Sequence, residues 1–475
     1  MNRIKNYFSM KNLLYLFILS CPILDIISFI FRNTFDTNIS ITTLLRPIIP
    51  VVLFIIIFIK ENKKSKLVIL SVVIIYIIYS IIHLLLYSYL ITTSSYGGIL
   101  HESQYLINYS FVVLLLYVSF KILYKKENQF LKYVIVSTMA IYVFSIYISI
   151  ITKTSSSSYI EGLGYKGWFE SANSISSILV ILLTLVFSQF INFKNLKIKA
   201  VVILIMLLTI IYLSMLIGTR VGLYGSICVL GVYIFLEFLF SIIKQKKSKI
   251  NFFVSFFIIS IILISFIFVF GSNTFKRRMY LKNLESNIVD KTTNEGSHVT
   301  GDILVLRQKI ILNGIDNSYM NESQKKSILD LYDYANKIEL TNNDIRMQQL
   351  IYNVFLVKNQ SNFFLIMFGN GYLLNTNELV FEMEIPAILF NFGIIGFILY
   401  ILPFIIIAFY SISKVLNSLK KSDIEIFMLF IADGFAFSFS ILAGYTFFNI
   451  SSATIIIISN ILLLNKIYKI GGEKN

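Results

Sequence analysis

Charged residues are scarce in this sequence. Asp, Glu, Lys and Arg make up 14% of 475 residues, 57% are hydrophobic, and the mean hydropathy is +0.78. A soluble domain of this size needs far more charge on its surface, so the deficit excludes the soluble classes. Apolar runs of roughly 20 residues, enough to cross a hydrocarbon core of about 30 Å, recur along the chain. We therefore expect an all-α polytopic membrane protein.

Cysteine and clustered acidic residues are scarce too. The two cysteines, Cys21 and Cys228, lie in apolar runs, so neither a disulfide framework nor a zinc site is indicated. The sequence has no Asp-rich cluster of the kind that holds a divalent ion, and we expect neither metal nor cofactor. No small-residue cleavage site follows the first apolar run, Leu13–Ile30, which indicates a retained helix rather than a signal peptide.

We predict about twelve transmembrane helices. They fall near residues 12–32, 43–60, 66–91, 104–122, 131–152, 174–192, 198–217, 221–242, 251–271, 383–411, 424–443 and 448–467. Every second connection is rich in lysine, which by the positive-inside rule puts both termini in the cytoplasm. The net charge of +16 then reflects topology and attraction to anionic membrane lipid, and it does not indicate nucleic-acid binding.

A single long polar stretch interrupts this pattern. It divides the chain into membrane helices 1–9 (residues 1–271), a large extracytoplasmic loop (272–382) and membrane helices 10–12 (383–475). Within the loop, apolar residues at helical spacing predict helices over 322–337 and 343–357, the second with Asp344 as a cap.

Three arginines are candidates for binding an anion. Arg220 follows the tight Gly218-Thr219 turn and must lie at the membrane boundary, where its guanidinium could grip a phosphate or pyrophosphate. The alternative is an arginine that snorkels to the interface. Arg307 and Arg346 lie in the large loop and could add positive charge there, although most loop arginines are simply solvated.

Two carboxylates, Glu382 and Glu384, enter an apolar segment just before the tenth predicted span. A charge there is costly unless it faces water, a cation or a substrate, which favours a role in acid/base chemistry or sugar binding. The alternative is a pair of interfacial carboxylates bound to lysines such as Lys358.

The only tryptophan, Trp168, lies in the connection after the fifth predicted span. Trp168 could stack on a sugar ring and Asn173 could bond sugar hydroxyls. The alternatives are an aromatic-belt anchor for Trp168 and a helix N-cap for Asn173.

Four segments, in this order, resemble the O-antigen ligase/polymerase family, in particular the Wzy-type capsule polymerases. They are Gly167-Trp168-Phe169-Glu170-Ser171-Ala172-Asn173, Gly218-Thr219-Arg220, Arg346 ahead of Gly369-Asn370-Gly371, and Glu382-Met383-Glu384 ahead of Gly393-Ile394-Ile395-Gly396. The match covers roughly residues 130–412. Family ligases have a histidine where this sequence has Glu382, which favours the polymerase, although the polymerase pattern usually has an aspartate at the position of Glu384.

The resemblance implies a GT-C-like membrane glycosyltransferase that uses a polyprenyl-pyrophosphate-linked oligosaccharide without a metal. It implies that Arg220 and Arg346 neutralise the pyrophosphate and that Glu382 or Glu384 accepts the acceptor's proton. Trp168, Asn173, Arg307, Asn370 and Tyr372 would contact substrate. Other polysaccharide export or chain-length proteins are expected partners. A ligase acting on a lipid, protein or wall acceptor and a lipid-linked oligosaccharide flippase are the alternatives.

Overall fold

The computed structural model describes most of the chain. The described residues are 9–35, 45–95, 97–126, 128–159, 162–190, 192–244, 271–280, 283, 302–312, 314–340, 344–374, 379–417, 423–442, 444 and 446–472. Within them, nine helices are long and apolar enough to cross a membrane, or ten if one bent pair counts as a single span. The polytopic all-α prediction is therefore confirmed, apart from two short strands, whereas the number twelve is not.

The candidate spans follow the predicted order. They are α2 (Met10–Phe35), α5 (Lys63–Leu90), α6 (Gly98–Leu123), α7 (Leu131–Ile151), α8 (Ala172–Phe190), α9 (Leu196–Ile211) with the π-turn η1 (Tyr212–Leu216), α10 (Arg220–Lys244), α20 (Ile424–Leu442) and α21 (Ile450–Gly472). At the second predicted span the structure has only the 13-residue α4 (Ile48–Lys60). The ninth, 251–271, lies outside the described residues apart from Gly271.

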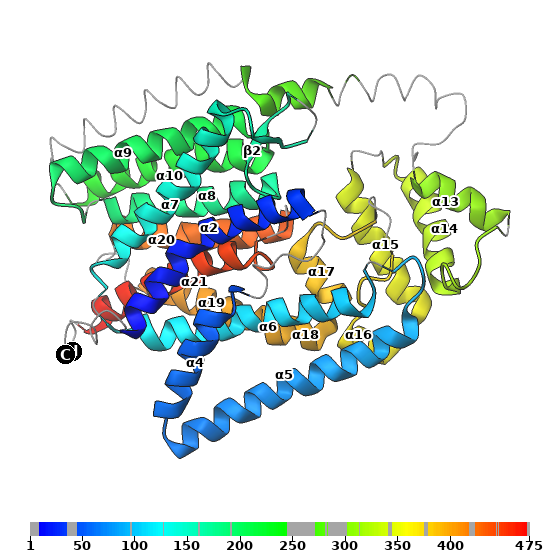
Figure 1. Cartoon of the computed structure of the whole chain (residues 1–475). Helices are drawn as coiled ribbons and strands as arrows, with labels where there is room; N and C mark the ends of the chain where they lie inside the picture. The colour runs from blue at the N-terminus through cyan, green and yellow to red at the C-terminus, as the bar shows by residue number, and fades with distance from the viewer. Residues whose placement is uncertain are drawn as a thin grey trace.

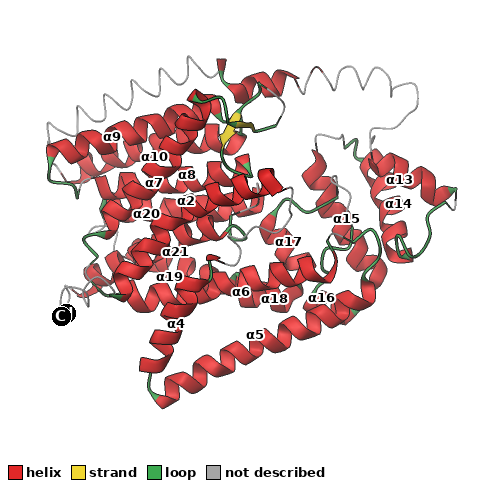
Figure 2. Ribbon diagram, in the orientation of Figure 1, coloured by secondary structure: helices red, strands yellow, loops and turns green. Residues whose placement is uncertain are grey.

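Helix α8 forms the centre of the bundle (Figures 1 and 2). It packs against α7, α10, α20 and α21, and 94% of its most apolar stretch is buried. Helix α5 is the opposite case, since only 11% of its corresponding stretch is buried and rows of Ile, Leu and Val remain exposed. Such an apolar exposed surface suits contact with lipid, whereas α8 contacts protein on all sides.

The basic connections meet at one end of the bundle. The contacts that join them are Lys121 to Glu61 at 2.6 Å, Lys132 to the Asn192 carbonyl at 2.8 Å, and the ion pair of Lys466 with Glu425. The first turn of α2 and the last turn of α21 lie at this end too, and helices α13–α15 lie at the opposite end (Figure 1). The structure thus separates the lysine-rich connections from the predicted loop.

The tenth predicted span is broken. It consists of α17 (Glu384–Asn391), α18 (Gly393–Tyr400) and α19 (Leu402–Asn417), and α18 meets α19 at a bend of 52°. Pro403 has no N–H to donate to the Leu399 carbonyl one turn earlier, and proline at such a point bends a helix. The Tyr76 hydroxyl of α5 donates to that carbonyl instead, at 2.5 Å.

The predicted loop forms a small domain-like unit of its own. It contains α13 (Asp302–Ile311), α14 (Glu322–Lys337), α15 (Ile345–Gln360) and α16 (Phe363–Phe368), with a separate apolar core to which Tyr87 of α5 contributes. The predicted helix 322–337 is confirmed with the same bounds, and Asn321 begins it through a capping box. The helix predicted over 343–357 begins at Ile345. Asp344 occupies the N-cap position, as predicted, although its side chain makes no capping hydrogen bond.

Candidate functional site

Arg346 and Glu382 form an ion pair beside the end of α20. Arg346 lies in the first turn of α15, with its Nε 3.0 Å from Glu382 Oε2. Its Nη1 donates to the carbonyl of Leu442, the last residue of α20, at 2.6 Å. The side chains are 40% and 37% exposed, so part of the guanidinium remains accessible. Two residues that the sequence singled out 36 positions apart are thus in direct contact.

Backbone contacts hold Glu382 in this position. Gln349, one turn after Arg346 on the same face of α15, is fully buried and accepts the Glu382 N–H at 3.0 Å. On the other side, Gly444 has φ +72° and lies so close to the Glu382 carbonyl that a Cβ would come within 1.7 Å of its oxygen. Because only glycine fits there, the α20–α21 connection can pass directly over Glu382.

Glu384 has a different environment although it is only two residues further. It is buried at the start of α17, and its carboxylate accepts the backbone N–H groups of Thr446 at 2.8 Å, Phe447 at 2.7 Å and Phe448. Three donors satisfy most of the hydrogen-bonding capacity of a carboxylate. The contacts anchor the α20–α21 connection to α17, which gives Glu384 a structural task.

Arg220 is the first residue of α10 and is exposed. It makes no hydrogen bond or ion pair with any residue that the structure describes. The turn before it is rigid, because Gly218, at φ +78°, packs against the Leu163 carbonyl and Thr219 Oγ1 lies 2.6 Å from Ser176 Oγ. The π-turn η1 precedes this turn, and π-bulges are frequent at functional sites. Arg220 therefore follows a rigid turn, and its guanidinium has no partner among the described residues.

Arg220 and Arg346 lie at the same end of the helix bundle. Gly225 of α10 faces Phe439 of α20, so the first turns of α10 lie beside the last turn of α20 in an antiparallel pair. Arg220 is about one and a half turns before Gly225, and the carbonyl that binds Arg346 is about one turn after Phe439. The predicted pair of arginines thus borders one end of the α10–α20 pair.

The segment with Trp168 and Asn173 follows residues that pack against the Gly218-Thr219 turn. Strand β2 (Tyr165–Gly167) pairs with β1 (Ser156–Ser157), and the half-buried Trp168 donates through Nε1 to Thr154 Oγ1 at 2.9 Å. Asn173 Oδ1 accepts from the Tyr159 hydroxyl at 3.1 Å. Asn173 is not the cap of α8, since the Ser174 N–H bonds to Ser171 Oγ instead. Both predicted residues therefore make local contacts.

Glu170, in the same segment, is held by two elements. Its carboxylate pairs with Arg32 at 3.0 Å and accepts from Ser28 Oγ at 2.8 Å, both on α2. The Lys166 ammonium donates to the Glu170 carbonyl at 2.9 Å, and partial burial lowers the pKa of Lys166. These contacts fix the segment to the first helix of the chain.

The Phe368–Tyr372 segment is held by a buried histidine–carboxylate pair. His83 Nδ1 contacts the Phe368 carbonyl at 2.7 Å, and Nε2 lies 2.8 Å from Glu102 Oε1. A carbonyl only accepts, so Nδ1 carries the hydrogen of that contact. Glu102 Oε2 accepts the Tyr372 N–H at 3.2 Å. His83 and Glu102 thus hold the Phe368–Tyr372 segment against α5 and α6.

Asn370 and Tyr372 have contrasting surroundings within that segment. The Tyr372 ring stacks on Tyr105 with centroids 4.4 Å apart, and only 8% of Tyr372 is exposed. Asn370 is 1% exposed, yet neither its amide oxygen nor its amide nitrogen has a hydrogen-bond partner among the described residues. Buried amides nearly always have partners, so this one is unusual.

Arg307 is not near Arg346 in any contact that the structure shows. Its guanidinium lies over the Tyr332 ring, 4.2 Å from the centroid, where α13 packs on α14. This is a cation–π contact inside the loop's own core. Of the two loop arginines that the sequence left open, the structure puts only Arg346 beside Glu382.

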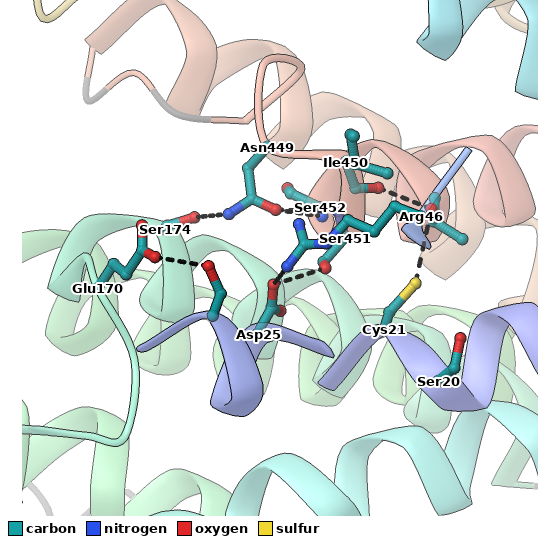
Figure 3. Close-up of polar contacts among 12 residues, drawn as sticks. Ser20, Cys21, Asp25, Arg46, Glu170, Ser174, Asn449, Ile450, Ser451 and Ser452 are labelled. Carbon is teal, nitrogen blue, oxygen red and sulfur yellow. Dashed lines mark hydrogen bonds and ion pairs between the residues drawn. The ribbon is translucent and has the colours of Figure 1, made fainter. Parts of the chain in front are cut away.

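A polar cluster inside the bundle was missed by the sequence prediction (Figure 3). Asp25 of α2 pairs with Arg46, just before α4, at 2.5 Å, and accepts from Tyr142 at 2.7 Å and Ser451 at 3.0 Å. The sequence did contain a signal for it. A carboxylate within an apolar membrane run is energetically costly, so Asp25 could have been identified as a residue that needs a polar partner. The same rule would have found Glu102.

Among the described residues, no group of three or more His, Cys, Asp or Glu side chains gathers as a set of metal ligands. Metal independence stays a prediction.

Comparison with known proteins identifies a family. The family model of the O-antigen ligase like membrane proteins matches residues 5–468, nearly the whole chain. No curated protein matches the chain significantly. The match includes every segment of the site described above and implies a membrane glycosyltransferase with lipid-linked glycan substrates. The chain therefore belongs to the O-antigen ligase like membrane protein family.

Proposed function

We propose that this protein polymerises polysaccharide by joining polyprenyl-pyrophosphate-linked oligosaccharide repeats at the outer face of the cytoplasmic membrane. The observation that carries the proposal is the partly exposed Arg346–Glu382 pair at the same bundle end as Arg220, which has no hydrogen-bond or ion-pair partner among the described residues. The basic connections at the opposite end support a cytoplasmic side there, and hence an outer position for the arginines.

The proposed reaction requires that the two substrates be held in the right orientation and that the negative charge of the leaving group be neutralised. An acceptor hydroxyl attacks the anomeric carbon of the donor chain, forming a new C–O bond while the C–O bond to the pyrophosphate breaks. The departing pyrophosphate takes the bonding electrons, and the guanidinium groups of Arg220 and Arg346 neutralise its charge. Pyrophosphate draws Arg346 away from Glu382, which leaves that carboxylate free to accept the hydroxyl proton.

Glu382 is the better candidate for the base. It is partly exposed and paired with a guanidinium that the substrate can recruit. Glu384 is buried, and three backbone N–H groups already occupy its carboxylate. We assign the proton transfer to Glu382 and the support of the α20–α21 connection to Glu384.

Transfer of finished glycan to another acceptor is the second candidate, since the family name itself refers to a ligase. The glycan of a deletion strain separates the candidates. Polymerase loss leaves single repeats on the lipid, and ligase loss leaves long chains that are not transferred. Unflipped repeats at the cytoplasmic face would instead indicate a flippase and would contradict the proposal.

Orientation has a separate test. A cysteine at exposed Asp333 of α14 should react with an impermeant thiol reagent from outside the cell, and one at Ser65, in the first turn of α5 next to the basic connection, should not. The reverse labelling pattern would place the arginines in the cytoplasm and would contradict the proposed reaction.

A further inference from the structure

A small cleft lies directly beside the Arg346–Glu382 pair. It runs between α15 and the segments Gly371–Leu374 and Leu379–Phe381, and Asn391 of α17 also lines it. Phe381 lines it and immediately precedes Glu382. Asn353 of α15 lines it two turns after Arg346 on the same face of that helix. The cleft therefore continues from the ion pair along α15.

Polar atoms without partners mark the cleft. Tyr352 and Asn391 line it and are each 3% exposed, yet among the described residues the Tyr352 hydroxyl and the Asn391 Nδ2 have no hydrogen-bond partner. Asn370, which immediately precedes the lining residue Gly371, has two further such atoms. A buried polar group without a partner costs about 1–3 kcal/mol. A ligand with hydroxyl or amide groups would supply the missing partners.

The lining shows which ligand chemistry fits. Among the described residues, no Lys, Arg, Asp or Glu side chain lines the cleft, so this lining offers no charged group to a pyrophosphate or a carboxylate. Its polar side chains are two phenols, Tyr352 and Tyr372, and two amides, Asn353 and Asn391, and the remaining side chains are apolar. A neutral sugar ring has this character, with hydroxyl or acetamido groups at its rim and C–H groups on its faces.

We propose that this cleft binds one neutral sugar ring of the lipid-linked glycan, with the Tyr352 hydroxyl and the Asn391 amide as its hydrogen-bonding groups. The proposal rests on the proposed function, since the ring must belong to a substrate whose pyrophosphate or hydroxyl reaches Arg346 and Glu382. The ring can come from the donor chain or from the acceptor repeat, and the chemistry of recognition is the same for both.

The first test measures protection of a cysteine in the cleft. Val380 lines the cleft and is partly exposed, so Val380→Cys in a Cys21→Ser, Cys228→Ser background provides a reporter. Lipid-linked repeats extracted from the native strain should slow its reaction with a maleimide several-fold. Polyprenyl pyrophosphate alone should not. Asp333→Cys on α14 serves as the control and should react equally in all cases. Equal labelling of Val380→Cys with and without repeats would overturn the proposal.

The second test separates a ligand role from a structural one. Tyr352→Phe and Asn391→Leu remove buried polar atoms that lack protein partners, so thermal stability should stay unchanged or rise. Protection by repeats should fall in both variants. Tyr334→Phe, at an exposed tyrosine on α14, is the matched control and should change neither property. Retained protection in both cleft variants would contradict the assignment of these two groups.

Kinetics then identify the source of the ring. With long-chain donor and single-repeat acceptor supplied separately, Tyr352→Phe should raise the apparent KM for one of them and leave kcat nearly unchanged. An increase for the single repeat assigns the cleft to the acceptor, and an increase for the long chain assigns it to the donor. An unchanged KM for both would overturn the proposal.

The two proposals fail in different ways. Protection of Val380→Cys without any polymer in a reconstituted assay would overturn the polymerase and support the sugar cleft. Polymer formation without protection would overturn the cleft and support the polymerase.

Discussion

Two arginine–carboxylate pairs in this protein have similar chemistry and opposite surroundings. The Arg46–Asp25 pair lies within the bundle, 13% and 12% exposed, and Tyr142 and Ser451 complete the shell of Asp25. The Arg346–Glu382 pair lies where α15 meets the end of α20, about three times more exposed, and a backbone carbonyl is the other partner of Arg346.

The difference indicates how each pair can be used. A buried pair that loses one partner leaves an uncompensated charge, which is strongly destabilising, so the Arg46–Asp25 pair is fixed by the fold. An exposed pair contributes little to stability, about 0–1 kcal/mol, and can exchange its partner without unfolding the protein. Of these two pairs, the second is therefore the one suited to release its guanidinium to a substrate anion.

The largest effect should follow the loss of either site arginine. Arg220→Ala and Arg346→Ala should each reduce polymer below detection at an unchanged protein level, because the departing pyrophosphate loses a counter-charge. Lysine should restore little, since it lacks the bidentate fork. Polymer formed in cells and by purified enzyme is the measurement, with Arg278→Ala, another exposed arginine, as the control. Full activity in either alanine variant would remove that residue from the site.

Glu382→Gln should be the next most severe change for activity. The amide keeps the size of the side chain but cannot accept the proton, so turnover should fall on the order of 10² to 10⁴-fold while donor binding persists. Glu384→Gln is the matched comparison. The glutamine amide has only one oxygen, so its NH₂ group would face backbone N–H donors that now lack an acceptor. The Glu384→Gln substitution should therefore lower thermal stability. Near-normal turnover in Glu382→Gln would show that Glu382 is not the base.

Asp25→Ala should act on stability. Removing one partner of a buried pair typically costs about 3–5 kcal/mol, and the yield of folded protein in detergent should fall accordingly. An Asp25→Leu, Arg46→Met double variant should recover much of the loss, because no charge is then left buried without a partner. A fully stable Asp25→Ala protein would remove the distinction between the two pairs.

Arg307 should show the smallest effect. Its contact with Tyr332 is a cation–π interaction worth about 0.5–1 kcal/mol when exposed, so Arg307→Leu should lower the melting temperature slightly and leave polymer formation intact. The variant also checks the choice of loop arginine. Loss of polymer in Arg307→Leu together with activity in Arg346→Ala would exchange the two assignments.

Sequence alone predicted the elements whose pattern is local. The apolar runs gave the membrane class, and the face of Ile328, Leu331 and Tyr332 gave helix α14 with its bounds. It did not predict the break in the tenth span. Leu402-Pro403 is a local signal, but the bend also needs Tyr76, more than 300 residues away, to bind the carbonyl that the proline leaves free.

The site was predictable only in part for the same reason. Sequence identified Glu382 and Glu384 as candidates and favoured Glu382 as the base and Glu384 as a sugar contact, but only through the family resemblance. Their difference comes from the α20–α21 connection, which offers three N–H groups to one of them and a glycine to the other. The Asp25 cluster was missed because the three partners of Asp25 come from three other segments of the chain.

The His83–Glu102 pair has a consequence for the order in which this chain assembles. Its two members are 19 residues apart on consecutive helices, so they can neutralise one another as soon as α5 and α6 have entered the bilayer. The atoms that complete the pair, the Phe368 carbonyl and the Tyr372 N–H, are synthesised some 270 residues later. The α5–α6 hairpin thus forms early and presents the two side chains that later bind the Phe368–Tyr372 segment. That segment can pack against the hairpin only after it has been synthesised.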